Sequence, residues 1–226
     1  MKKGIIIFLL FALTLVGGLY ATRNISFSKN QIEYSEKEFQ GLIDQKEIQN
    51  GDLIFQTSNS QQSKAIQLAT NSIYSHCGII FQEDNKYYVL EAVQPVKRTT
   101  LEKWIARGKD RKYVIKRLKN ASQVLTPEII ENMKKVGDEF RGKNYDLTFE
   151  WSDDKMYCSE LIWKIYQRAT GLEIGELQHL RDFDLSSQVV KQKMNERYGP
   201  NIPLDEIVIS PSAIFNSELL ETVKSN

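Results

Sequence analysis

The sequence predicts an α+β domain built on one mainly antiparallel sheet with helices packed against it. Short apolar runs rich in β-branched and aromatic residues are grouped in the first part of the chain, at residues 51–55, 75–81, 86–93 and 113–118. A helix with apolar residues at helical spacing comes later and begins at a cysteine, at residues 158–170. Strands grouped ahead of a late helix are typical of α+β domains.

The first 22 residues read as a targeting segment and not as part of the fold. Lys2 and Lys3 precede an uncharged, apolar stretch at residues 4–20, which is the pattern of a signal peptide and is also close to the shortest membrane-spanning helix. Residues 23–50 are polar and are expected to form a stalk with a short helix at residues 35–46. We therefore expect a domain at residues 51–226, exported to the cell envelope, periplasm or exterior, with a leader that is either cleaved or kept as a membrane anchor.

The charge of the chain is nearly balanced. Lysine and arginine total 30, and aspartate and glutamate total 29. No broad cationic face is implied, so nucleic acid is not expected as a partner.

The first elements of the domain follow from turn residues and apolar runs. Gly51 and Asp52 form a turn before the first strand, and residues 63–70 are expected to form a short helix. The runs at 75–81 and 86–93 flank Glu83-Asp84-Asn85. This arrangement predicts a β-hairpin.

Helices are predicted after the hairpin at residues 100–107 and 125–140, with the strand at 113–118 between them. Thr126 and Pro127 form a helix start, with an N-cap residue followed by proline at the first helical position. The cysteine-led helix is expected to end at Gly171. Further along, residues 207–209 are expected to form a strand and residues 213–223 a helix.

The hairpin is expected to bring His76 and Glu91 to one face of the sheet. If the hairpin loop has an even number of residues, these two side chains project from the same side. A four-residue loop would make them direct partners, and a two-residue loop at Asp84-Asn85 would place them one diagonal step apart. A carboxylate beside an imidazole fixes its tautomer and stabilises its charged form, although both residues could also be ordinary polar groups at strand ends.

Cys158 is a candidate nucleophile because it opens a helix. Unpaired backbone N–H groups and the positive end of the helix dipole favour the thiolate, which is the reactive form of sulfur. The alternative is a buried cysteine that packs as a small apolar residue.

Four short blocks of the sequence resemble the permuted papain-like hydrolases called YiiX-like, a circularly permuted branch of the NlpC-type superfamily. In order along the chain, the blocks are GDLIF at 51–55, SHCGII at 75–80, VLEA at 89–92 and YCSEL at 157–161. The resemblance spans about residues 51–211. It implies a papain-like fold with permuted topology, in which the histidine and its acidic partner precede the nucleophile.

The resemblance implies a role for each of three residues. Cys158 takes the place of the nucleophile, His76 that of the base, and Glu91 that of the carboxylate that orients the histidine. For the oxyanion, the backbone N–H of Cys158 is a natural donor, and Tyr145 or Tyr157 could add a hydroxyl, although Tyr157 is more simply explained by packing.

The other histidine and cysteine of the chain are not expected to bind a metal, and no cofactor is expected. Cys77 follows His76 in a strand, so it is expected to point to the opposite face, away from Cys158. A zinc site built from these three residues would need both faces, and His179 has no cysteine or carboxylate at metal-ligand spacing. Glu160 lies in the first turn of its helix, where a structural role suffices.

The expected reaction is thioester-mediated hydrolysis by a Cys-His-Glu triad. The resemblance offers two substrate classes, which are amide bonds of peptides or peptidoglycan fragments, our preferred class, and acyl lipids. Two other kinds of protein stay open. One is a non-catalytic module that binds lipid or cell wall, and the other is a surface protein stabilised by a disulfide between Cys77 and Cys158.

Overall fold

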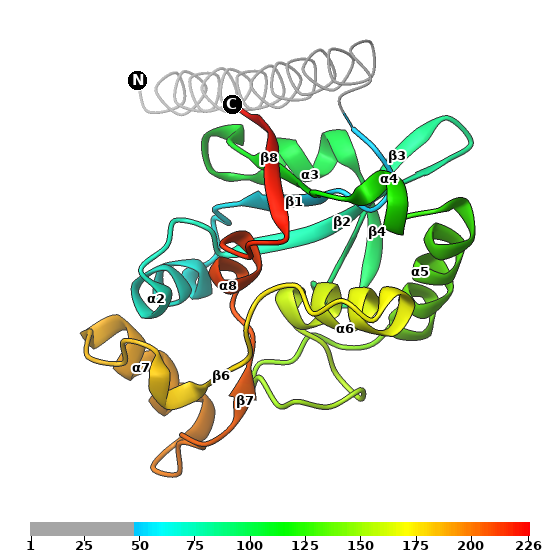
Figure 1. The fold of residues 1–226 in the computed structure, drawn as a ribbon. Helices are drawn as coiled ribbons and strands as arrows, with labels where there is room; N and C mark the ends of the chain where they lie inside the picture. The colour runs from blue at the N-terminus through cyan, green and yellow to red at the C-terminus, as the bar shows by residue number, and fades with distance from the viewer. Residues whose placement is uncertain (1–47) are drawn as a thin grey trace, which may run out of the picture.

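A six-stranded antiparallel sheet forms the centre of the domain (Figure 1). The computed structural model describes residues 48–226, so the predicted leader, most of the stalk and its helix at 35–46 lie outside the described residues. In spatial order the strands are β4 (Lys97–Thr100), β3 (Lys86–Glu91), β2 (His76–Glu83), β1 (Leu53–Gln56), β5 (Val114–Leu118) and β8 (Leu220–Ser225). All the pairs in this sheet are antiparallel, which confirms the predicted α+β class.

The hairpin of β2 and β3 has the shorter of the two predicted loops. Glu83 pairs with Lys86, and the turn residues Asp84 and Asn85 have φ angles of 47° and 60°. Positive φ at both central positions is the geometry of a type I′ turn, which Asp and Asn tolerate. With this register, Glu91 lies one diagonal step from His76.

Two long helices cover one face of the sheet, α5 (Pro127–Phe140) and α6 (Cys158–Thr170). The Thr126 side chain accepts a hydrogen bond from the Ile129 N–H and caps α5 as predicted. Leu161, Ile162 and Ile165 of α6 are fully buried against this face. Burying this apolar stripe fixes the position of the first residue of α6.

The opposite face of the sheet is covered by α3 (Leu101–Arg107), which follows β4 directly. Trp104 of α3 is fully buried against Ile54, Ile80 and Val89. In Figure 1, α3 and α6 lie on opposite sides of the strands. Successive strand residues face opposite sides, so His76 and Glu91 belong to the α3 side and Cys77 to the α6 side.

A smaller unit beside the sheet contains α2 (Gln61–Thr70) and α7 (Gln188–Tyr198), which pack on each other through Ala65, Val190 and Met194. A two-stranded sheet of β6 (Gln178–His179) and β7 (Ile207–Val208) joins it to the rest. The strand predicted at 207–209 is therefore present but lies outside the main sheet. The remaining short elements are η1 (Lys109–Arg111), α4 (Ala121–Val124), η2 (Leu180–Asp182) and α8 (Pro211–Phe215).

The predicted helix at residues 213–223 is wrong. The chain leaves the helical conformation after α8 and returns as β8, which pairs with β5 through Leu220 and Leu118. Pairing satisfies the backbone groups of β5 at this edge, and this tertiary contact outweighs local helix propensity.

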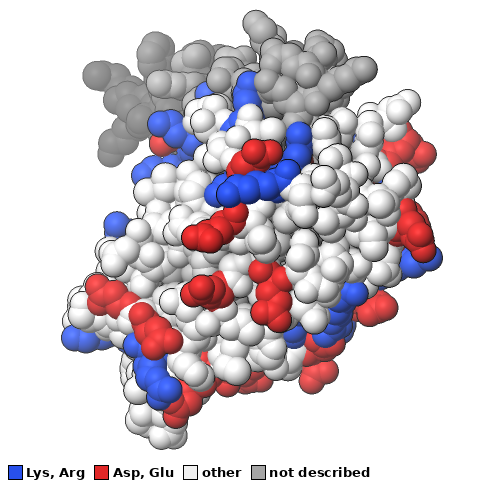
Figure 2. Space-filling model, viewed as in Figure 1, with Lys and Arg blue, Asp and Glu red and all other residues white. Residues whose placement is uncertain are grey.

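Charged side chains are interspersed on the surface. Figure 2 shows Lys and Arg close to Asp and Glu across the visible face, without one large cationic area. Within residues 48–226, no helix combines the length and apolar character that a membrane crossing requires.

Candidate active site

Cys158 is the first residue of α6 and is buried, with 3% of its surface exposed. Tyr157, the residue before it, has an extended backbone, so the chain turns into the helix at the cysteine. The first N–H groups of an α-helix lack intrahelical partners and carry the positive end of the helix dipole. The sulfur therefore lies where a thiolate is favoured.

His76 is the first residue of β2, and Glu91 is the last residue of β3. The imidazole Nε2 and Glu91 Oε2 are 2.6 Å apart in a buried hydrogen bond. The ring stacks on Trp104, with centroids 5.9 Å apart and an interplanar angle of 24°. These two contacts fix the orientation of the imidazole.

Glu91 accepts hydrogen bonds from three residues besides His76. Thr99 Oγ1 donates to Oε1 at 2.6 Å, Trp104 Nε1 donates to Oε2 at 3.0 Å, and Arg107 also donates to Oε2. Burial alone would raise the pKa of Glu91, but the bond to His76 and the charges of His76 and Arg107 outweigh it and lower the pKa to about 2. The carboxylate is therefore ionised at any pH where the protein is expected to work.

Sequence reasoning missed Thr99, Trp104 and Arg107. Trp104 and Arg107 are three residues apart on a predicted helix, so a shared face was foreseeable. That this face would meet the end of β3 was not foreseeable, because the contact depends on where α3 packs on the sheet.

The thiol of Cys158 and the imidazole of His76 interact, and each shifts the pKa of the other. Burial alone would lower the pKa of His76, but the bonds and negative charges of Cys158 and Glu91 raise it to about 9. The pKa of Cys158 is well below its usual value. Hydrogen bonding from Cys77 lowers this pKa most, burial raises it, and His76 lowers it further. A thiolate–imidazolium pair is the expected charge state at neutral pH.

Cys77 lies close to Cys158, so the prediction that the two cysteines are kept apart is wrong. Cys77 does face away from His76, toward Leu90 and Ala92, but α6 packs on that same face. His76 forms the last pair of the β1–β2 ladder, so its ring lies at the end of the sheet, where one sulfur can reach groups from both faces. Both cysteines are free thiols in this structure.

Two tyrosines were predicted as possible oxyanion donors. Tyr145 lines the same pocket as Cys158, whereas the hydroxyl of Tyr157 is used in a hydrogen bond with the backbone. The Tyr145 hydroxyl accepts a hydrogen bond from Gln62 Nε2 at 2.9 Å. Burial and the negative charge of Cys158 raise its pKa well above the usual value, so it stays a proton donor. The Tyr157 hydroxyl accepts the Ile209 N–H at 3.1 Å. Gln62, in α2, was not predicted because nothing in its local sequence marks it.

Glu160 and His179 lie in structural surroundings. Glu160 is fully buried and is 2.8 Å from Lys164 Nζ. Burial raises the pKa of Glu160 to about 7, against the lowering effect of Lys164. His179 Nδ1 is 2.9 Å from the Asp205 carbonyl oxygen. No group of three or more metal-ligating side chains (His, Cys, Asp or Glu) occurs in the part of the chain that the structure describes.

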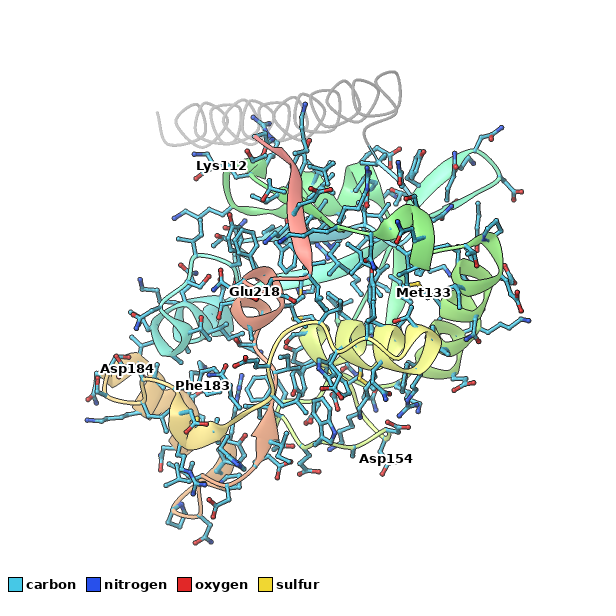
Figure 3. The ribbon with its side chains drawn as sticks, in the orientation of Figure 1. Lys112, Met133, Asp154, Phe183, Asp184 and Glu218 are labelled. Carbon is cyan, nitrogen blue, oxygen red and sulfur yellow. The ribbon has the colours of Figure 1, made fainter. Side chains whose placement is uncertain are left out.

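A groove runs from Cys158 between α2 and α7. The residues that line the groove are mostly apolar. Phe183 is one of these residues and is labelled near α7 in Figure 3. The main lining residues on the two helices are Ala65, Ile66, Val190 and Met194, with Lys193 and Arg197 on the same face of α7. The Arg197 guanidinium lies 4.8 Å from the centre of the Phe149 ring.

A cysteine heading a helix that packs on an antiparallel sheet, with a histidine and its carboxylate supplied by that sheet, defines a papain-like protein. In this chain the histidine and the carboxylate precede the cysteine, which is the permuted order. Residues 47–224 match the family described as "Permuted papain-like amidase enzyme, YaeF/YiiX, C92 family". The chain belongs to this family, which confirms the resemblance found in the sequence.

Two relatives extend the comparison. The chain is 51% identical over 175 residues to the "Uncharacterized protein YiiX" of Escherichia coli strain K12, an alignment that covers 77% of this chain and 85% of that protein. A solved structure described as "metalloprotein yiiX from Escherichia coli O157:H7" superposes with a TM-score of 0.76 at 50% identity and covers 79% of this chain and 97% of that one.

Proposed function

We propose that this protein is a cysteine amidase that works through Cys158, His76 and Glu91. The observation that carries the proposal is the arrangement of three groups: the imidazole of His76 is held 2.6 Å from the buried Glu91 carboxylate, and it lowers the pKa of the Cys158 thiol at the start of α6. The family is one of papain-like amidases, and this arrangement contains the groups that amide cleavage by a thiolate requires. A non-catalytic binding module would have no need to hold the pKa of Cys158 low.

In the proposed reaction, the Cys158 thiolate attacks the amide carbonyl carbon. Negative charge then develops on the carbonyl oxygen, and the Cys158 N–H and the Tyr145 hydroxyl are the proposed donors to it. The protonated His76 gives its proton to the leaving nitrogen, and the C–N bond breaks to leave a thioester. His76 then takes a proton from water, which attacks the thioester and releases the acid.

The groove favours a substrate whose acyl half is apolar. A peptidoglycan stem peptide is polar and would leave much of this surface without a partner, whereas a hydrocarbon chain would gain from leaving water. We therefore propose an amide with a hydrocarbon acyl group, and not the polar peptide that the sequence led us to prefer. Ester lipids form the second candidate class, because the same groove and the same thiolate would serve them.

We derive no step that passes through a metal. The Escherichia coli O157:H7 relative is described as a metalloprotein, but the described residues of this chain contain no set of three metal-ligating side chains. In addition, Nε2 of His76 is bonded to Glu91, so that ring nitrogen is not available as a ligand. We also propose that residues 1–22 direct the export of the chain.

The dependence of hydrolysis on acyl chain length tests whether the groove between α2 and α7 binds the acyl half of the substrate. We call this groove the acyl groove. For p-nitrophenyl esters from acetate to decanoate, we expect kcat/KM to rise by about fourfold for each added CH₂, because burying a CH₂ is worth about 0.8 kcal/mol. Ala65→Trp should flatten this dependence by filling the groove. Ile73→Trp, at an exposed position, is the control and should keep it. A flat profile in the wild-type protein, together with release of cell-wall peptides, would contradict the proposal.

The pH dependence of alkylation tests the thiolate–imidazolium pair. Iodoacetamide should label Cys158 rapidly at pH 6, where an ordinary thiol is almost fully protonated, because the pKa of Cys158 is held low. The rate should change again near pH 9, as His76 loses its proton. Burial raises the pKa of Cys77 well above the usual value, so that thiol should stay unlabelled. Peptide mapping by mass spectrometry identifies the site, and equal labelling of both cysteines would contradict the assignment.

A further inference from the structure

A second hollow lies beside His76, separate from the acyl groove. It is lined by Gln56, Ser58, His76, Val93 and Arg107. Gln56 is the cross-strand partner of His76 at the end of the β1–β2 ladder. Cys158 borders the first groove and His76 the second, so the two reacting side chains each face a different cavity.

The buried Gln56 side chain has one polar atom, the amide oxygen, that lacks a partner among the described residues. Only 2% of its surface is exposed, and within residues 48–226 its Oε1 has no hydrogen-bond partner. The carboxamide packs against Gly108, where an added Cβ would lie 2.2 Å from Oε1. An unsatisfied buried amide costs free energy, and native proteins rarely keep one without a reason. A bound group that donates a hydrogen bond would supply that reason.

Arg107 contributes positive charge to the same hollow. Its Nη2 donates to Glu91 and lies 3.3 Å from the imidazole Nε2, and 36% of the side chain is exposed. Nη2 is the one nitrogen of the Arg107 guanidinium that has a hydrogen-bond partner among residues 48–226. The remaining N–H groups can therefore bind an anion that enters the hollow, and the planar guanidinium matches a carboxylate well.

We infer that this hollow binds the amine half of the substrate, and that this amine bears a carboxylate, as an amino acid does. The inference rests on the proposed function. His76 must deliver a proton to the leaving nitrogen, so the amine half has to lie beside the imidazole, while the acyl half extends along the apolar groove at Cys158. Gln56 Oε1 accepts an N–H of the amine half, and Arg107 binds its carboxylate. The substrate class is an N-acyl amino acid.

The reverse of the first step tests the subsite directly. An octanoyl thioester on Cys158, formed from p-nitrophenyl octanoate, can react with water or with an added amine. In the second case the C–N bond forms, the C–S bond breaks to release the Cys158 thiolate, and the amine proton passes to His76, which restores the thiolate–imidazolium pair. An amine that fits the hollow should compete with water in a saturable way.

The measured quantity is the ratio of octanoyl amide to octanoate, followed by mass spectrometry with glycine or with the uncharged glycinamide. The ratio is independent of how much enzyme is folded. After correction for the reactivity of each amine toward a free octanoyl thioester, we expect glycine to saturate and to exceed glycinamide by about tenfold, since a charge-assisted hydrogen bond is worth about that factor.

Gln56→Met removes the hydrogen-bonding groups at similar size and should lower the corrected ratio for glycine by about tenfold. The matched control is Gln82→Met, near the other end of β2, which should keep the preference. Ratios that rise linearly for both amines and do not change in Gln56→Met would overturn the subsite while leaving the amidase proposal standing. Failure to form any octanoyl-enzyme would overturn the proposed function and the subsite with it.

Discussion

Cys158→Ala is expected to reduce ester and amide hydrolysis by roughly 10⁴-fold or more, because the residue supplies the nucleophile of the first step. The groups around it would remain, but an imidazole without the thiolate has nothing to activate for the first step. The variant should also lose alkylation by iodoacetamide at pH 6 and should form no acyl-enzyme in intact-mass spectra.

The neighbouring thiol provides the matched comparison. Cys77→Ala keeps the nucleophile and removes the hydrogen bond that most lowers the pKa of Cys158, so its alkylation profile should shift to higher pH while acyl-enzyme still forms. Circular dichroism and thermal unfolding would establish that both variants are folded. Full activity in folded Cys158→Ala, or labelling that follows Cys77 instead, would end the assignment of the nucleophile.

Glu91→Gln is expected to impair both activity and stability. A carboxamide cannot hold the positive charges of His76 and Arg107, and removing one partner of a buried ion pair destabilises by about 3 kcal/mol. We expect kcat/KM to fall by roughly 10²-fold, because the imidazolium loses its orienting charge. Steady-state kinetics and urea unfolding at pH 7 measure the two effects.

The pH dependence of the stability difference gives this prediction a sign. The folded pKa of Glu91 is lowered to about 2 from an ordinary 4.5, so its contribution to stability is complete above the unfolded pKa. It is lost as the pH falls from about 4.5 toward 2. The gap between the wild type and Glu91→Gln should therefore be widest near neutral pH and should shrink in acid.

Glu83→Gln is the control for this effect. Glu83 lies on the same hairpin and pairs with Arg98, but both side chains are partly exposed, so the change should cost less than about 1 kcal/mol and should leave activity intact. Equal losses in the two variants would mean that Glu91 supports only the hairpin and not the imidazole.

Several features of the site could be read from the sequence because they depend on local periodicity. The two-residue period of a strand was enough to place His76 and Glu91 on one face, and an even-length turn was enough to hold them within reach of each other. The apolar spacing of residues 158–170 predicted the buried helix, and the position of Cys158 at its start followed from that. The order of histidine, glutamate and cysteine pointed to the permuted family.

Other features were decided only by contacts between distant segments. Strand β8 forms because β5 has a free edge, although residues 213–223 by themselves suggest a helix. Helix α7 has only two buried residues, too few to stand out in the sequence, yet it provides one wall of the acyl groove. Cys77 meets Cys158 because α6 packs on the face that Cys77 occupies. Alternation along a strand specifies which face a side chain takes, but the helix that covers each face, and the cavities left between, depend on how the whole chain buries its apolar surface.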